Sequence, residues 1–127
     1  MADECVFSAN QMPAVARAAA ADVVSLKLVK HGGPLNTRKV AAVAEAAGVG
    51  LYGGSLLESS IGAAAHRHVF ASLREFTWGC EHFGPQILVE DLVTEPLRFE
   101  GFHVHLPIGP GLGVTLDHDK LRWFART

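Results

Sequence analysis

Short apolar segments alternate with longer alanine-rich or amphipathic segments up to about residue 85. The short segments are rich in β-branched, aromatic and other apolar residues, which is typical of buried strands. They occupy residues 23–28, 49–54 and 76–81. The longer segments have the composition or spacing of helices. They occupy residues 8–23, 37–48 and 56–73.

Local signals mark the expected ends of these helices. Ser8 or Asn10 can cap the first helix, and Asn36 or Thr37 can cap the second. Gly48 supplies a stop for the second helix. We therefore expect the sequence HGGPLN, which precedes the second helix, to form a turn.

The regular alternation of strands and helices predicts an α/β fold built from consecutive βα units with parallel strands. The pattern changes after Pro85, where residues 86–116 are strand-like and broken by proline and glycine. The polar ending, residues 117–127, favours one or two helical turns. We therefore divide the chain into a βα part at 1–85 and a mostly β tail at 86–127.

Composition narrows the classes of function. The chain has 127 residues and is 49% apolar, so it can bury a core. Its net charge is −2, so it lacks the excess of basic residues that is typical of proteins that bind nucleic acid or anionic membranes. We expect neither nucleic acid nor a membrane as a partner. Cys5 and Cys80 fit no zinc or redox spacing, and the acidic N-terminus MADECVF does not resemble a signal peptide. These features together predict a cytoplasmic protein.

Three chemistry-capable residues fall at or beside the expected carboxyl ends of strands. They are Asp3 (with Glu4 beside it), Lys27 and Glu81. Burial lowers the pKa of a lysine, so Lys27 could act as a base, and the carboxylates could bind a cation or move a proton. The alternative is that Lys27 only pairs with a carboxylate or extends to solvent. Lys30, an odd number of residues further along the strand, is expected to face the opposite way.

Histidines and glycines give weaker signals. His103 and His105 would share one face of a strand and could chelate a metal, although a solvated edge is the simpler interpretation. His66 and His68 lie two apart on a predicted helix and face different ways. The GPGLG sequence at 109–113 lacks the lysine of a phosphate loop, which favours a plain turn.

Several motifs, taken in order, resemble the C-terminal part of the muconate cycloisomerase family of the enolase superfamily. They are ADECVF, SLKLVKHGG, LYGGSLLESSIG, TWGCEHFGP and PIGPGLGVTLD. The resemblance covers essentially the whole chain. It implies the C-terminal part of a (β/α)8 barrel, about three βα units, followed by a tail that returns to a capping domain. It also implies reversible lactonization of cis,cis-muconate, a small dicarboxylate, to muconolactone. This reaction is a step in catechol breakdown.

The resemblance also implies roles for individual residues. Asp3 matches a carboxylate ligand of the catalytic Mn²⁺ or Mg²⁺, while Lys27 and Glu81 match residues that face the substrate. Gly54, Ser55 and Glu58 match the substrate-binding segment. In this interpretation Lys27 lies in an apolar strand because the barrel interior needs an amine there.

The departures from the family pattern limit these implications. A complete barrel needs about 250 residues, and the family's Lys-x-Lys motif and two further metal carboxylates have no counterpart here. We therefore expect a truncated or split protein that binds metal weakly, is inactive alone, and forms homo-oligomers or associates with a missing N-terminal part. Two alternatives remain open: another enolase-superfamily enzyme, such as a dipeptide epimerase or an o-succinylbenzoate synthase, and a non-catalytic oligomerising fragment.

Overall fold

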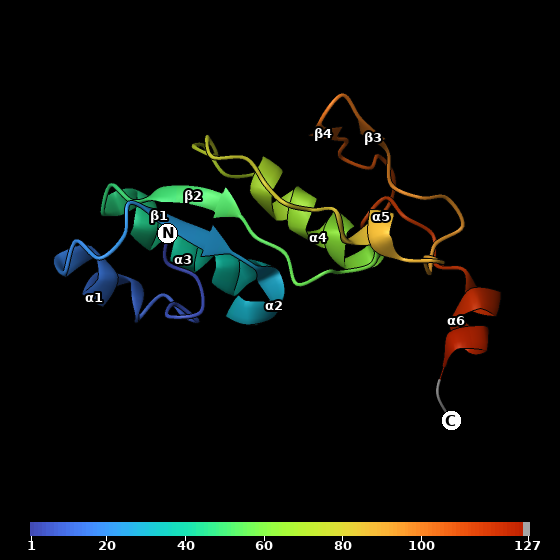
Figure 1. Cartoon of the computed structure of the whole chain (residues 1–127), viewed down its shortest axis with the longest axis horizontal. Coiled ribbons are helices and arrows are strands. Elements are labelled where there is room, and N and C mark those ends of the chain that lie inside the picture. Colours follow the sequence, from blue (N-terminus) through green and yellow to red (C-terminus); the bar gives the residue numbers. More distant parts are fainter. Residues whose placement is uncertain (126–127) are drawn as a thin grey trace.

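A computed structural model of the protein describes residues 1–125 (Figure 1). The final two residues of the predicted C-terminal segment lie outside the described part. The helices are α1 (Met12–Arg17), α2 (Leu28–His31), α3 (Pro34–Ala46), α4 (Ser60–Ala71), α5 (Gly84–Ile87) and α6 (His118–Phe124). The strands are β1 (Val23–Leu26), β2 (Gly50–Gly53), β3 (Phe99–Glu100) and β4 (His103–Val104).

The parallel sheet predicted from the sequence is present. Strands β1 and β2 pair in parallel, with Val23 opposite Gly50 and Leu26 opposite Gly53. Single parallel bridges extend this pair on both sides, because Ala2 pairs with Val24 and Gly53 pairs with Cys80. Four extended segments therefore lie side by side, and their carboxyl ends meet at one edge.

The third predicted strand is shorter than expected. Only Cys80 of residues 76–81 pairs with a neighbour, because Thr77 and Trp78 form a turn and Gly79 has a φ of +75°. β1 is also shorter than the predicted 23–28. It ends at Leu26, and Lys27 is the last extended residue before α2 begins at Leu28.

The first two predicted helices have different limits in the structure. The segment 8–23 contains only the short α1, because the Gln11 side chain accepts hydrogen bonds from the Phe7 and Ser8 amides and holds the preceding residues in a turn. Beyond α1 the chain turns at Ala19, whose φ is +46°. α3 begins three residues before the predicted start at 37, with Pro34 in its first turn.

The third predicted helix and the tail also differ from the prediction. Residues 56–59 form a loop before α4, with Leu57 at a φ of +63°. The predicted mostly β tail is largely irregular. It contains α5, the two-residue strands β3 and β4, and one antiparallel bridge between Val93 and Leu116. Proline and positive-φ glycine residues interrupt the strand-like pattern there. The polar ending forms α6, as predicted.

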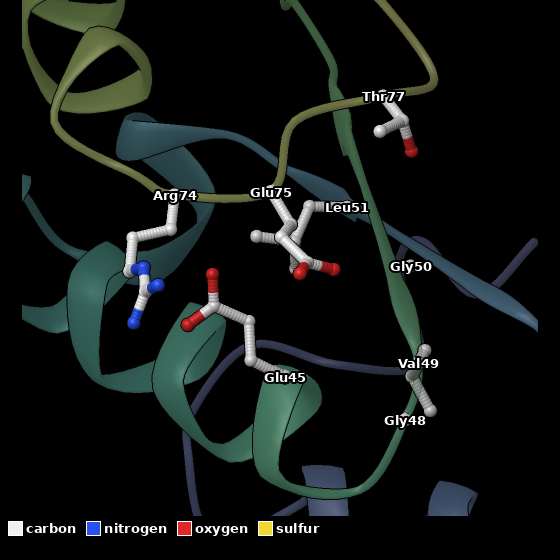
Figure 2. Close-up of a pocket in the computed structure, with 8 residues that line it drawn as sticks. All are labelled: Glu45, Gly48, Val49, Gly50, Leu51, Arg74, Glu75 and Thr77. Carbon is white, nitrogen blue, oxygen red and sulfur yellow. The ribbon is translucent and has the colours of Figure 1, made fainter.

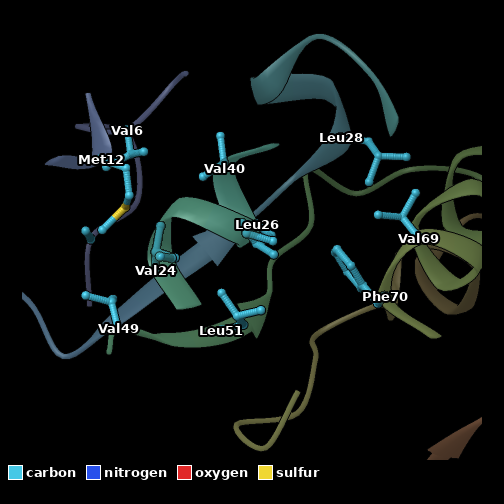
Figure 3. Packing of buried hydrophobic residues seen from close by; sticks show 13 residues of the cluster. Val6, Met12, Val24, Leu26, Leu28, Val40, Val49, Leu51, Val69 and Phe70 are labelled. Carbon is cyan, nitrogen blue, oxygen red and sulfur yellow. The ribbon is translucent and has the colours of Figure 1, made fainter. Parts of the chain in front are cut away.

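The principal core lies between the parallel strands and the helices that cover them (Figure 3). Val24 and Leu26 of β1 and Val40 of α3 are fully buried, and Leu51 of β2 is almost so. The second half of the chain is less covered, with Val89 and Phe102 fully exposed. Within residues 1–125, no helix combines the length and apolar character needed to cross a membrane.

Candidate functional site

Lys27 lies beside two acidic side chains at the carboxyl end of β1. Its ammonium nitrogen is 2.7 Å from Asp3 Oδ2 and 3.0 Å from Glu4 Oε1, and its side chain is 6% exposed. The parallel pairing of Ala2 with Val24 brings the N-terminal acids beside the end of β1. The structure therefore places Asp3 and Lys27 together, and Glu4 also turns toward the lysine.

The prediction that Lys30 faces away from Lys27 is wrong. Its ammonium nitrogen lies 2.9 Å from Asp3 Oδ1, 2.9 Å from the Asp3 carbonyl oxygen and 2.8 Å from the Ser25 carbonyl oxygen. The reason is that Lys30 belongs to helix α2, so the alternation of a strand does not apply to it. Three acceptors satisfy its three protons, and both lysines converge on one carboxylate.

The prediction of a lowered pKa for Lys27 is also wrong. Burial acts in that direction, but hydrogen bonds and charge from Asp3 and Glu4 outweigh it, and the pKa of Lys27 is raised. Burial likewise acts to raise the pKa of Asp3, and hydrogen bonds from Lys27 and Lys30 outweigh it, so the pKa of Asp3 is lowered. The pair is ionised at neutral pH, and Lys27 carries a proton to donate.

Glu81 lies on the neighbouring loop, one residue after the bridge at Cys80. Its Oε1 accepts a hydrogen bond from the Ser55 amide at 3.2 Å, and its Oε2 accepts one from the Tyr52 hydroxyl at 3.4 Å. Burial and the charge of Glu81 raise the pKa of Tyr52, which keeps the phenol a donor. Sequence reasoning missed Tyr52, because a single tyrosine in an apolar strand gives no distinctive signal.

The predicted substrate-binding residues form the loop after β2. Glu58 accepts hydrogen bonds from Ser55 Oγ at 2.6 Å and from the Leu56 amide at 2.9 Å, which fixes the loop as a tight turn. Burial acts to raise the pKa of Glu58, but these hydrogen bonds outweigh it and the pKa is lowered. A Cβ on Gly54 would clash with Ser25 Oγ and would lie 2.9 Å from Lys27 Cγ, so glycine allows the loop to pass this close to the end of β1.

His66, from α4, is a further residue of this region that sequence reasoning missed. Its Nε2 accepts a hydrogen bond from the Leu28 amide at 2.9 Å, directly after Lys27. Its Nδ1 lies 2.9 Å from the Gly62 carbonyl oxygen and therefore carries the ring proton. The ring thus fixes the start of α2. Its contact is 38 residues away in the chain, so local spacing could not reveal it.

His82 is buried beside His66, with ring centroids 5.1 Å apart, and its Nε2 donates to the Gly54 carbonyl oxygen at 3.2 Å. Its pKa is lowered from 6.5 to about 4, because burial penalises the charged ring and the charge of Arg67 acts in the same direction. The folded state therefore favours neutral His82. Its contribution to stability is complete above the unfolded-state pKa of 6.5 and is lost as the pH falls toward 4.

We predict that acid destabilises the chain through His82. Between pH 7.5 and pH 5 this residue alone should lower the free energy of unfolding by about 2 kcal/mol. Urea unfolding at both pH values measures the effect, and His82→Gln, which keeps a donor for Gly54, should remove it. The exposed His103 provides the matched control, His103→Gln. An unchanged pH dependence in His82→Gln would contradict the prediction.

A metal ion does not fit the residues of this chain by themselves. Within residues 1–125, no three histidine, cysteine or acidic side chains gather as a metal would require. Both carboxylate oxygens of Asp3 already face ammonium groups. The histidine pair of the tail is not such a site either, because His103 Nδ1 lies 2.7 Å from the Gly101 carbonyl oxygen and His105 lies beside Glu100.

A separate cavity of about 360 Å³ lies at the opposite end of β2 (Figure 2). Glu45, Arg74 and Glu75 surround it, beside Gly50 at the start of the strand. It contains none of the predicted site residues. Ligands of parallel α/β sheets bind at the carboxyl ends of strands, which favours the Lys27 region as the candidate site.

The family comparison covers almost the whole chain. The model of the enolase C-terminal domain-like family matches residues 1–120. The chain belongs to this family. The family match confirms the resemblance to the enolase superfamily that the sequence motifs indicated.

Individual relatives of this enolase-superfamily chain are cycloisomerases. It is 48% identical over 126 residues to muconate cycloisomerase 1 of Pseudomonas putida and 49% identical to chloromuconate cycloisomerase CbnB of Cupriavidus necator. Each comparison covers 99% of this chain and 34% of the relative. The chain thus spans about a third of the length of these relatives.

Solved structures give the same result. Muconate lactonizing enzyme from Pseudomonas putida matches with a TM-score of 0.95 and 48% identity, over 99% of this chain and 35% of that one. The Pseudomonas fluorescens enzyme complexed with muconolactone matches with a TM-score of 0.95 and 46% identity, over 99% and 34%. The chain therefore has the fold of the corresponding part of muconate lactonizing enzyme.

Proposed function

We propose that this chain is the C-terminal portion of a muconate cycloisomerase and contributes to the reversible lactonization of cis,cis-muconate to muconolactone. The observation that carries the proposal is the convergence of Lys27 and Asp3 beside the loop that holds Glu81. The identity to cycloisomerases over 99% of the chain supports the same function.

The proposed chemistry follows from the protonation states in the site. Lys27 carries a proton, so it can pair with a carboxylate of the dicarboxylate substrate or deliver a proton to carbon. Glu81, held by Tyr52 and the Ser55 amide, lines the other side of the substrate. The turn fixed by Ser55 and Glu58 shapes the entrance, and Gly54 leaves room for the lysine stem.

We further propose that Asp3 contributes one carboxylate to a Mn²⁺ or Mg²⁺ site whose other ligands lie outside these residues. Hard cations need several oxygen ligands, and this chain offers too few. The four parallel segments support residues 1–85 as part of a (β/α)8 barrel, with 86–127 as the tail that joins it to a cap. A cytoplasmic location belongs to the same proposal.

Two other functions stay as alternatives. A dipeptide epimerase would usually have an Asp-x-Asp motif at the last strand, where this chain has Cys80, Glu81 and His82, which favours muconate. A non-catalytic oligomerising fragment is supported by the exposed apolar residues Val89 and Phe102. Association, with a second copy or with the remaining part of the fold, is part of our proposal in either case.

Reconstitution tests the proposed function. The chain is mixed with the remaining two thirds of a related muconate cycloisomerase, and loss of cis,cis-muconate is followed by its ultraviolet absorbance. We expect no turnover by the chain alone and measurable turnover by the mixture, because only the mixture completes the carboxylate set. Dipeptide and succinylbenzoate substrates serve as controls. A stable complex that converts one of these but not muconate would overturn the assignment.

A further inference from the structure

His66 of α4 connects two segments that carry residues of the candidate site. Its Nε2 accepts the hydrogen bond from the Leu28 amide at 2.9 Å, directly after Lys27 in the chain. The same nitrogen lies 3.5 Å from Glu58 Oε1, in the loop after β2, and the His66 side chain is 1% exposed. The ring therefore joins the backbone beside Lys27 to the proposed substrate-binding loop through a buried contact.

The backbone junction that His66 contacts sets the direction of Lys27. The backbone of Lys27 is extended, with a φ of −137° and a ψ of 121°, and α2 begins at the next residue. Lys27 occupies the cap position, but its side chain makes no capping hydrogen bond, and the first amides of a helix have no acceptor within the helix. Leu28 is 5% exposed, and an amide that is buried without an acceptor is costly. His66 supplies the acceptor that this junction needs.

Other contacts fix the ring of His66 itself. Its Nδ1 lies 2.9 Å from the Gly62 carbonyl oxygen, one turn earlier in α4. The rings of Phe70 and His82 pack against it edge to face, with centroids 5.6 Å and 5.1 Å away. Because the ring is held by its own helix and by two neighbouring rings, α2 starts where the ring places the Leu28 amide.

A shift of this junction would move the reactive nitrogen. The Lys27 ammonium group contacts Asp3 at 2.7 Å and Glu4 at 3.0 Å, and Lys30 of α2 contacts the other carboxylate oxygen of Asp3. Both lysines therefore depend on the point at which α2 starts. A displacement of about 1 Å at a reacting group is enough to lower a rate about a hundredfold, even when the altered residue is distant.

We propose that His66 is a positioning residue for Lys27. Its hydrogen bond to the Leu28 amide holds the junction between β1 and α2, so that the ammonium group meets the substrate in the productive geometry. This catalytic part rests on the proposed function of Lys27. His66 acts through the Leu28 backbone and transfers no proton to the substrate, so a side chain that keeps an acceptor at the same reach should replace it.

Amide hydrogen exchange of the 127-residue chain tests the contact without any activity. His66→Leu removes the acceptor and should speed exchange of the Leu28 amide about tenfold, whereas His66→Gln keeps an acceptor oxygen and should restore slow exchange. His68→Leu is the matched control, because His68 lies on the same helix and its Nε2 contacts the Leu112 carbonyl oxygen. An unchanged Leu28 rate in His66→Leu, or an equal acceleration at the buried Val40 amide, would overturn the proposal.

Kinetics of the reconstituted enzyme tests the link to Lys27. His66→Leu should lower kcat about thirtyfold and change KM by less than about twofold, and His66→Gln should restore most of the kcat. His68→Leu should leave both constants unchanged. In a Lys27→Met background, His66→Leu should cause no further loss, because its effect passes through the ammonium group.

The two backgrounds distinguish positioning from general support of the fold. A purely structural role of His66 would lower kcat by the same factor with and without Lys27, and this result would overturn the proposal. Absence of turnover by the unsubstituted mixture would refute the proposed function instead. The exchange rate of the Leu28 amide would then still decide whether His66 holds the junction.

Discussion

Replacing Lys27 by methionine should lower the kcat of the reconstituted enzyme by about a thousandfold, within the range expected for loss of a positioned proton donor. The ammonium group is buried and held by Asp3 and Glu4, and the three protons of the neighbouring Lys30 are already taken by Asp3 and the Ser25 carbonyl oxygen. Methionine keeps the length of the stem and removes only the charge and the protons. Steady-state kinetics with cis,cis-muconate measures the effect, and circular dichroism checks the fold.

Lys39→Met is the matched control, because Lys39 is an exposed residue of α3 and is not one of the residues of the site. Its kcat should match that of the unsubstituted chain. Lys30→Met should also reduce kcat, because Lys30 holds Asp3 through two contacts. A Lys27→Met enzyme with at least a tenth of the original kcat would show that Lys27 is structural and not catalytic.

The reconstituted enzyme also separates two roles for Lys27. If its ammonium group only binds a substrate carboxylate in the ground state, Lys27→Met raises KM and leaves kcat nearly unchanged. If it transfers a proton or stabilises developing charge, kcat falls and KM changes little. We expect the second pattern, because the charge of Lys27 is already paired with Asp3 and Glu4 and is therefore less available to hold a substrate carboxylate in the ground state.

The sequence was sufficient to predict the repeating βα order and the acids and lysine at strand ends. Strand composition and helical spacing are local signals, and parallel pairing then places Asp3, Lys27 and Glu81 along one edge. Glu4 was predicted only as a neighbour of Asp3, because the direction of its side chain depends on the Lys27 charge.

The features that the sequence did not reveal depend on contacts between distant residues. Lys30 was misplaced because α2 begins immediately after Lys27, and the Leu28 amide that opens this helix is satisfied by His66 from α4. Likewise the tail has the composition of strands, but its prolines and positive-φ glycines prevent long pairing. Neither effect is visible in a local window.

The last prediction concerns Asp3, whose carboxylate is shared by two buried lysines. Asp3→Asn should lower the free energy of unfolding by about 3 kcal/mol at pH 7, because it leaves both ammonium groups without their main counter-ion. Urea unfolding measures this loss. Glu4→Gln, which removes an acid that is 67% exposed, is the control and should cost less than about 1 kcal/mol.

The pH dependence of stability distinguishes this ion cluster from a packing effect. The pKa of Asp3 is lowered from 3.8, so its contribution is present above pH 3.8 and is lost as the pH falls through the lower folded value. The pKa of Lys27 is raised from 10.5, so its contribution is present below pH 10.5 and is lost as the pH rises through the higher folded value. The chain should therefore keep the full contribution of the cluster between these limits, whereas Asp3→Asn should lose the acid-dependent part. An equal loss of stability in Asp3→Asn and Glu4→Gln would show that the shared carboxylate does not hold the lysines in place.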